Sequence, residues 1–235
     1  MNIWVCIDSG VKNEEMARLD AVALEAALAL KDAAASSVSI TVVHLGVGGE
    51  TLLKRALGMG ADEALWIRGE AGDLLPARKA RALAGALAPA DLILTGLQSE
   101  TGMSGSVGPF IAAELGITSV MGCLELSWDD GAGTVRAIQE VEGGGRNRLT
   151  LDLPCVLGIQ SGGYTPRYPA LSAMLKAQGR QIPILEMDGR TAEPAGMCAG
   201  PLELPQQDAV GEVWDGSAEE SAGRFRDWLT QRRWI

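Results

Sequence analysis

A loop dense in glycine, serine and threonine holds the residues of this sequence whose types and spacing could bind a charged ligand. It follows the apolar run Leu92 to Leu94 and ends at Pro109, which suits the first turn of a helix that continues to Gly116. A strand, a loop of small residues and a helix start direct backbone N–H groups and the positive end of a helix dipole at one place. The ligand that fits there is an anion, most often a phosphate. The small residues of the loop are Gly96, Ser99, Thr101, Gly102, Ser104, Gly105, Ser106 and Gly108.

The same loop has a second interpretation, a tight connection between a strand and a helix in which the glycines only allow positive φ angles. A turn of that kind needs one or two such residues. Eight small residues within thirteen positions, from Gly96 to Gly108, exceed that need. The composition therefore favours an anion site at the start of the helix.

The remaining side chains form no pattern typical of catalysis. The single histidine, His44, has no serine or cysteine nucleophile near it in the sequence, so we expect it to be structural. The glycines at 46, 48 and 49 do not form the GxGxxG motif, which argues against an NAD site of the Rossmann type. The cysteines form no CxxC pair, which argues against zinc or iron–sulfur sites and favours reduced thiols, two of them within strands. They are Cys6, Cys123, Cys155 and Cys198.

Composition narrows the class of protein and its partners. The chain has 235 residues, 47% of them hydrophobic, which is enough for one main core with a smaller appendage. The formal net charge of -10 argues against nucleic acid or an anionic membrane surface as the main partner. No apolar run approaches the roughly 18 residues of a membrane span, and Met1 leads directly into an apolar strand. We therefore expect a cytoplasmic protein with no transmembrane segment.

Short apolar runs alternate with amphipathic stretches up to the loop. One such stretch has apolar residues at positions 19, 22, 23, 26, 27 and 30, a single helical stripe. Strands that alternate with helices of this length indicate βαβ units and a parallel sheet. The expected strands are 2–7, 38–45, 63–68 and 91–95, and the expected helices begin near 19, 52 and 75.

After Gly116 the pattern changes to alternating apolar and polar residues. Three such segments, separated by Asp- and Gly-rich turns, indicate an antiparallel flap. An apolar run at 154–159 could rejoin the main sheet, and a short helix at 170–177 precedes a last edge strand at 184–187. The three alternating segments are 120–128, 134–141 and 146–153.

The last part of the sequence reads as a linker followed by a helical arm. Residues 189–211 are rich in Pro, Gly and Ala and have no periodicity. Ser217 and Glu220 form a capping box, and an apolar stripe with Trp228 and Trp234 follows. We expect two domains, 1–188 and 189–235. The arm's apolar face must either fold back on its own domain, the commoner case, or dock on a partner chain.

Five segments, taken together and in order, resemble the beta subunit of electron transfer flavoproteins. The resemblance covers residues 1 to about 188, and no single segment carries it. The segments are Ala23–Leu28, Ala56–Asp62 (ALGMGAD), Ser104–Gly108 (SGSVG), Val141–Gly144 (VEGG) and Pro166–Tyr168 (PRY), the last continuing through Leu171 to Ala177.

The resemblance implies a fold, a cofactor and partners. The fold would be a doubly wound α/β sheet of the adenine-nucleotide α-hydrolase-like type with the small antiparallel flap, to which the C-terminal arm described above is added. An alpha subunit would hold the redox FAD, and this chain would bind AMP or, in bifurcating members, a second FAD. It would be an electron carrier between a dehydrogenase and an acceptor, without bond-making chemistry of its own.

The resemblance also assigns residues to two sites. The phosphate loop would be Glu100–Pro109, which includes Val107, with Ala61 and Asp62 near the adenine. A docking segment for a dehydrogenase would carry Arg167, Tyr168, Leu171 and Lys176, with Leu171 as an apolar anchor and Arg167 free to pair with a carboxylate. The alternative for Leu171 is an inward-facing helix residue.

The sequence departs from the family pattern near the nucleotide. Asp8 and Ser9 follow the first strand where the family has lysine, and Ala17-Arg18 replaces Asn-Pro before the first helix. The Asp-rich opening of the loop is reduced to Ser99-Glu100-Thr101. The alternative function, of another class, is a stand-alone nucleotide-binding sensor with the same core fold.

Overall fold

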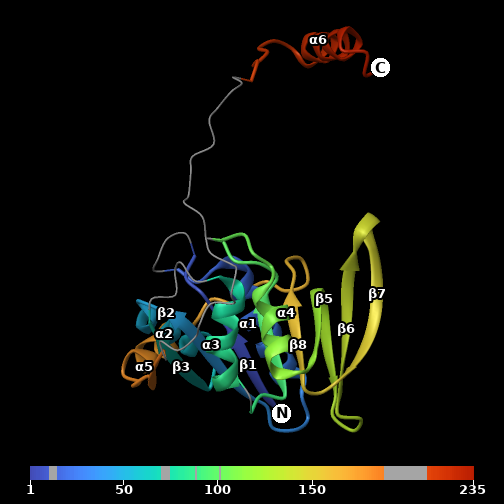
Figure 1. The fold of residues 1–235 in the computed structure, drawn as a ribbon. Coiled ribbons are helices and arrows are strands. Elements are labelled where there is room, and N and C mark those ends of the chain that lie inside the picture. Colours follow the sequence, from blue (N-terminus) through green and yellow to red (C-terminus); the bar gives the residue numbers. More distant parts are fainter. Residues whose placement is uncertain (11–14, 70–74, 88, 101, 188–210) are drawn as a thin grey trace. The chain divides into compact units, whose positions relative to one another are not determined.

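In the part of the chain that the structure describes, nine strands form one sheet in the order β7-β6-β5-β8-β4-β1-β2-β3-β9 (Figure 1). This computed structural model describes residues 1–10, 15–69, 75–87, 89–100, 102–187 and 211–235. Along the sheet, the neighbours β5-β8-β4-β1-β2-β3-β9 all pair parallel. The pairs β5-β6 and β6-β7 are antiparallel. The strands are β1 (Asn2–Cys6), β2 (Ser39–Gly46), β3 (Glu63–Arg68), β4 (Leu92–Gly96), β5 (Thr118–Asp129), β6 (Thr134–Val141), β7 (Gly145–Asp152), β8 (Cys155–Ile159) and β9 (Ile184–Glu186).

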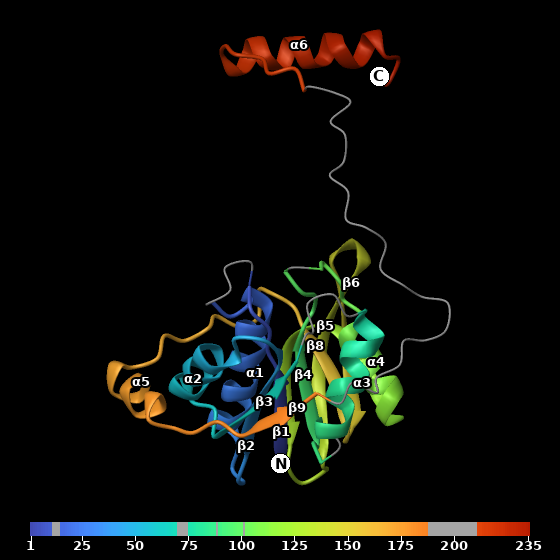
Figure 2. The ribbon, with the colours of Figure 1, turned by 60° about the vertical axis from the view of Figure 1, so that its left-hand side comes forward.

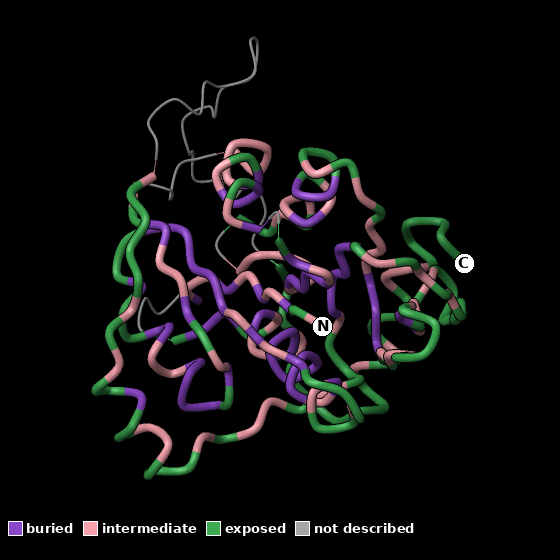
Figure 3. Tube along the Cα trace, turned by 90° about the horizontal axis from the view of Figure 1, so that it is seen from below, coloured by how far each residue is buried: buried purple, intermediate pink, exposed green. Residues whose placement is uncertain are grey.

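Helices cover both faces of the parallel strands (Figure 2). The helices α1 (Arg18–Ala33) and α2 (Gly49–Met59) lie on one face, where they share a buried core with β1, β2 and β8. The helices α3 (Pro76–Leu87) and α4 (Val107–Leu115) lie on the other face over a second core. Between these layers, β2, β4 and β8 are buried along most of their length (Figure 3). The predicted doubly wound α/β fold is confirmed.

The strand order reverses direction at β1. The chain runs outward through β1, β2 and β3, then returns to place β4 on the other side of β1. In open α/β sheets, ligands bind outside the carboxyl ends of the strands at such a reversal. The loop identified in the sequence follows β4, so the fold places it at this point.

The strand β5 turns back on itself near its middle. Its first residue, Thr118, pairs with Cys155, whereas its last, Asp129, pairs with Thr134, which in turn pairs with Asp152. Because Asp152 and Cys155 are three residues apart, both ends of β5 lie near the same edge of the sheet. The register shifts on either side of Cys123 mark the bend.

A glycine makes this bend possible. Gly122 has a φ of 82°, in the left-handed region that other residues avoid. The bend joins the parallel strands to β6 and β7, and β6 packs Val135 and Ala137 into the core on the α1 face. The predicted antiparallel flap therefore exists, but it continues the main sheet instead of standing apart from it.

Two further helices belong to the last third of the chain. The helix α5 (Leu171–Gln178) precedes β9, which lies at the edge of the sheet beside β3, as the sequence predicts. The chain divides into two compact units, Met1–Ala199 and Gly200–Ile235. The predicted linker lies outside the described residues except for Gly211, and the predicted domain boundary stays a prediction.

The second unit consists of α6 (Ala218–Gln231) and its flanks. The predicted capping box is confirmed: the Ser217 hydroxyl accepts the N–H of Glu220, and the Glu220 carboxylate accepts the N–H of Ser217. Aromatic rings form a chain of contacts along the helix, with centroids 5.3–6.4 Å apart. The rings belong to Trp214, Phe225, Trp228 and Trp234, and we call this set the aromatic cluster.

Candidate functional site

The loop after β4 presents hydrogen-bond donors at the start of α4. The first N–H groups of a helix have no partner within it, so those of Val107 and Gly108 point out of the helix end. The hydroxyls of Ser104 and Ser106 lie 2.7 Å apart beside them. These groups form the half-site that the sequence predicts for an anion. Thr101, also predicted here, lies outside the described residues.

A buried hydroxyl without a partner lies under this half-site. Thr95 is 6% exposed, and its Oγ1 has no hydrogen-bond partner among the described residues. A Cβ added to Gly108 would stand 3.1 Å from that oxygen. Buried polar groups are nearly always satisfied, and this oxygen beside the start of α4 is free to take a further hydrogen bond. The residues present therefore fit a phosphate group.

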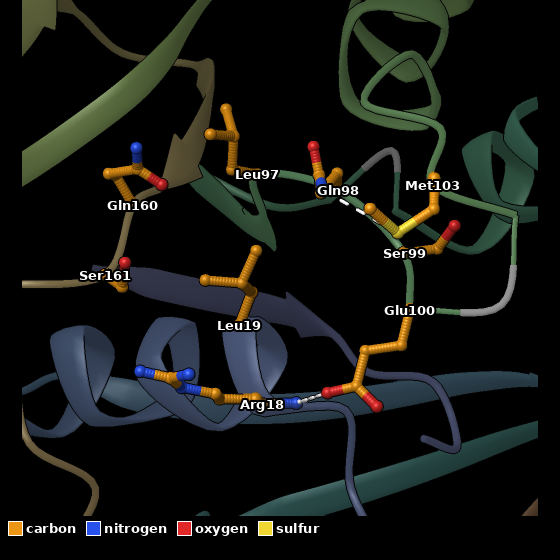
Figure 4. Close-up of a pocket in the computed structure, with 9 residues that line it drawn as sticks. All are labelled: Arg18, Leu19, Leu97, Gln98, Ser99, Glu100, Met103, Gln160 and Ser161. Carbon is orange, nitrogen blue, oxygen red and sulfur yellow. Dashed lines mark hydrogen bonds between the residues drawn. The ribbon is translucent and has the colours of Figure 1, made fainter. Parts of the chain in front are cut away.

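A cleft of about 490 Å³ opens next to the same loop (Figure 4). Its volume lies within the range of about 300–1,000 Å³ that is typical of small-molecule sites. Apolar side chains from α1 and the loop face amide side chains at the ends of β4 and β8. The residues that line it are Arg18, Leu19, Leu97, Gln98, Ser99, Glu100, Met103, Gln160 and Ser161.

Two carboxylates lie at the start of α1, and one of them already occupies a backbone donor there. Glu100 Oε1 accepts the N–H of Arg18 at 2.6 Å, a contact drawn in Figure 4. Asp20 accepts the N–H of Asp8 at 2.8 Å and that of Gly96 at 3.1 Å, so it ties together the carboxyl ends of β1 and β4. Gly96 permits this approach, since an added Cβ would lie 2.5 Å from Asp20 Oδ1. The start of α1 is therefore acidic, and an added phosphate belongs over α4.

The electrostatics of this acidic group follow from burial. Burial, together with the charges of Asp8 and Glu100, raises the pKa of Asp20 to about 7, although hydrogen bonds from the two backbone N–H groups offset part of the change. Burial, with the Asp20 charge, also raises the pKa of the Cys6 thiol. Cys6 is therefore held as a neutral thiol, which is a poor nucleophile.

The structure corrects the prediction for Ala61 and Asp62. Both precede β3, and Asp62 Oδ2 accepts the N–H of Ile40 near the start of β2. They therefore lie at the amino edge of the parallel strands, whereas the loop after β4 lies at the carboxyl edge. Four residues of strand separate the edges, about 13 Å. These two residues cannot line the site that the loop forms.

The segment predicted to dock a dehydrogenase presents apolar side chains to solvent. Leu171 is 76% exposed and Tyr168 is 92% exposed, so the alternative in which Leu171 packs inward is wrong. Leu175, one turn after Leu171, is 67% exposed, and Lys176 is exposed as well. A docking role for these residues stays a prediction.

Arg167, the remaining member of that segment, has a different place. Its guanidinium pairs with Glu25 at 2.7 Å and Asp32 at 2.8 Å, both on α1. The predicted pairing of Arg167 with a partner's carboxylate is corrected: its charge is used inside the chain.

The other candidate groups have structural surroundings. The two ring nitrogens of His44 lie 3.1 Å and 3.4 Å from the carbonyl oxygens of Ile7 and Val47, and the side chain is buried. The cysteines that are described, Cys6, Cys123 and Cys155, are free thiols, with Cys6 in β1 and Cys155 in β8. Within the described ranges no group of His, Cys, Asp or Glu is arranged to hold a metal ion.

Sequence reasoning missed three functional candidates. Thr95 ends an apolar run and looks like a core residue, and Asp20 follows the first apolar residue of a helical stripe. Glu25 offered a signal: it is the single charged residue within the helical stretch Ala21–Leu30. A lone carboxylate in such a helix must find a partner if the helix is buried on several sides.

Comparison with known proteins agrees with this geometry. The family model described as "Electron transfer flavoprotein domain" matches residues 3–188. The beta subunit of the electron transfer flavoprotein of Megasphaera elsdenii is 31% identical over 198 residues, covering 79% of this chain and 72% of that protein.

Two other relatives extend the comparison. The corresponding beta subunit of Bacillus subtilis is 30% identical over 216 residues, 86% of this chain and 80% of its own length. The caffeyl-CoA reductase-Etf complex subunit CarD of Acetobacterium woodii is 28% identical over 228 residues, 92% and 86% of the two chains. The chain therefore belongs to the electron transfer flavoprotein family, in which it has the role of the beta subunit.

Proposed function

We propose that this chain pairs with an FAD-bearing alpha subunit and carries electrons between a dehydrogenase and an acceptor, without making or breaking bonds itself. The proposal rests on one observation: the same α/β domain has both an anion half-site at the start of α4 and an exposed apolar docking segment. A stand-alone sensor needs the first and has no use for the second. FAD supplies one- and two-electron chemistry when bound to the partner. This chain supplies surfaces that hold and orient.

The nucleotide of this chain is AMP, with a second FAD as the alternative occupant. The N–H groups at the start of α4, with Ser104 and Ser106, receive the phosphate, and the Thr95 hydroxyl supports it from below. The apolar walls and amide side chains of the cleft receive the base. The described loop supplies one phosphate half-site, so the lone chain is expected to hold AMP more readily than FAD.

Thr95→Val tests the nucleotide site. Valine keeps the shape of threonine and removes an oxygen without a partner, so stability should stay the same or rise by about 1 kcal/mol. AMP affinity in calorimetry should fall roughly 10- to 100-fold, because a hydrogen bond to a charged group is worth about 1.5–3 kcal/mol. Thr134→Val on β6 is the matched control and should change neither. Equal AMP affinity in Thr95→Val and the unchanged chain would place AMP elsewhere.

The two partners use different surfaces. The alpha subunit takes the aromatic cluster of α6, where Phe225 and Trp234 are 52% and 67% exposed. The dehydrogenase takes the exposed segment with Tyr168, Leu171 and Leu175, which is small enough for a brief encounter. Lys176 adds a charge at the edge of that contact. We place the assembly in the cytoplasm, and no helix among the described residues has the length and apolar character to cross a membrane.

Co-expression with a candidate alpha subunit tests the whole proposal. The expected product is a yellow heterodimer that contains one redox FAD and is reduced by a flavin-dependent dehydrogenase. The chain expressed alone should be colourless. Stoichiometric FAD on the lone chain would make FAD, and not AMP, its nucleotide. A candidate pair that never associates, while the lone chain binds AMP and stays monomeric, would favour the sensor instead.

A further inference from the structure

The docking segment is held to the domain by one buried carboxylate. Glu25 is 8% exposed, and both of its oxygens accept from Arg167. The guanidinium Nε lies 3.0 Å from each oxygen, Nη2 lies 2.7 Å from Oε1, and the backbone N–H of Arg167 lies 3.0 Å from Oε2. One side chain of α1 thus fixes both the side chain and the backbone of a residue 142 positions away.

Asp32 pairs with the same guanidinium, but from a side chain that is largely exposed to solvent. Its Oδ2 lies 2.8 Å from Nη2 of Arg167, but its side chain is 61% exposed, against 11% for that of Glu25. Exposed ion pairs contribute little, since water and salt screen them, whereas a buried bidentate pair fixes geometry. Asp32 is therefore a natural control for Glu25.

A second contact holds the helix at the end of the segment. A Cβ added to Gly58 of α2 would lie 2.4 Å from Met174 Sδ and 3.5 Å from Met174 Cα. The missing side chain at Gly58 leaves a notch that Met174 of α5 fills. Because Leu171 and Leu175 flank Met174 on the outward side of α5, this notch sets how far those side chains stand from the domain.

We propose that Glu25 and Gly58 are positioning residues for electron transfer: together they hold the apolar docking segment in the shape that a dehydrogenase binds. The inference rests on the docking role proposed above for this segment. An exposed loop that is already ordered loses less conformational freedom on binding, so more of the contact energy is available for association. The two anchors lie on α1 and α2, the helices that share the core of this face.

Glu25→Gln tests the first anchor in the heterodimer with its alpha subunit. The probe is a flavin-dependent CoA-thioester dehydrogenase that reduces the unchanged complex. Gln keeps the size of Glu but turns a donor toward the guanidinium, so the KM of the dehydrogenase for the complex should rise about 10-fold. The kcat and the flavin spectrum should stay the same. Asp32→Asn, the control, should change KM less than 2-fold.

The role of Gly58, the second anchor, can be tested with a variant and a compensating second substitution. Gly58→Ala drives a methyl group into the thioether of Met174, which must leave the notch, and should raise KM in the same direction as Glu25→Gln but by less. The double variant Gly58→Ala with Met174→Ala removes the collision and should restore most of the lost affinity. Hydrogen exchange of residues 164–178 in the heterodimer reports the same change without a dehydrogenase. It should rise about 10-fold in Glu25→Gln and by a smaller factor in Gly58→Ala alone.

The outcomes distinguish the docking role of the segment from the positioning role of Glu25 and Gly58. If Leu171→Ala has no effect on KM, the docking role itself fails. If Leu171→Ala raises KM while Glu25→Gln and Gly58→Ala leave KM and exchange unchanged, the positioning role fails and the docking role stands. A lower melting temperature with an unchanged KM in both anchor variants would assign them to stability alone. If Glu25→Gln does not fold, Gly58→Ala and its rescue decide.

Discussion

A chain shortened to residues 1–204 is expected to lose nearly all affinity for the alpha subunit while its α/β domain stays folded. Both core clusters are built from residues of the first unit, so the domain keeps its stabilising contacts. The arm, by contrast, has no buried residue in its helix, although the helix and its flanks together carry the four rings of the aromatic cluster. A helix of 14 residues is marginal alone in water, so its apolar face requires cover. Co-purification of the shortened chain with the alpha subunit measures the loss.

Trp228→Ala is the sharper form of this test. Trp228 lies between Phe225 and Trp234 in the aromatic cluster, and the guanidinium of Arg232 lies 4.0 Å from its ring centroid. Central Trp residues typically cost about 2 kcal/mol or more when truncated, or roughly 30-fold in affinity. Thr230→Ala, on an exposed position of the same helix, is the control and should change affinity less than 2-fold. Full heterodimer formation by both the shortened chain and Trp228→Ala would contradict a binding role for the arm.

The local patterns of the sequence predicted the parallel part of the fold well. Alternation of apolar runs with helical stripes is a local signal, and each βαβ unit expresses it independently. The bend of β5 was not predictable in that way. Residues 120–128 read as one continuous strand, and only Gly122 signals the reversal, which depends on where β8 inserts.

The candidate site was predictable where its donors come from backbone. The start of α4 and its small residues follow from Gly, Ser and Pro chemistry alone. Thr95 and the pair of Glu25 with Arg167 depend instead on what the fold brings beside them, across 142 positions in the second case. The error for Ala61 and Asp62 has a simple cause. Residues that precede a strand lie at the amino edge, and a loop that follows a strand lies at the carboxyl edge.

The helix α1 is buried on several sides, which explains why its acidic residues Asp20 and Glu25 form specific hydrogen bonds within the domain. The sequence stripe predicts one apolar face, yet Leu24, Glu25 and Leu28 are buried as well as that stripe. The antiparallel strands and the segment at Arg167 cover the sides that a simple βαβ unit leaves open. A charged group within such a helix is retained only where a partner meets it. Asp20 meets two backbone N–H groups, and Glu25 meets Arg167.

Leu171→Ala is expected to slow electron transfer with a dehydrogenase and to leave stability almost unchanged. At 76% exposure the side chain has little contact to lose, so the free energy of unfolding should change by less than about 0.5 kcal/mol. As an apolar anchor in the partner's surface, it should raise KM about 10-fold or more, with kcat unchanged, because encounter complexes depend on a few central side chains. Stopped-flow reduction of the heterodimer's flavin by the dehydrogenase separates these two effects.

The matched control for Leu171→Ala is Leu185→Ala on β9. Leu185 is an apolar side chain of the same size, 49% exposed, in the middle of the edge strand β9. Its truncation should change neither KM nor kcat, which shows that the effect of Leu171 belongs to its place and not to the loss of exposed apolar area. A core leucine would instead cost about 2–5 kcal/mol of stability. A Leu171→Ala heterodimer that melts several degrees lower, yet is reduced at the normal rate once folded, would reject the docking role and leave the aromatic cluster as the partner surface of this chain.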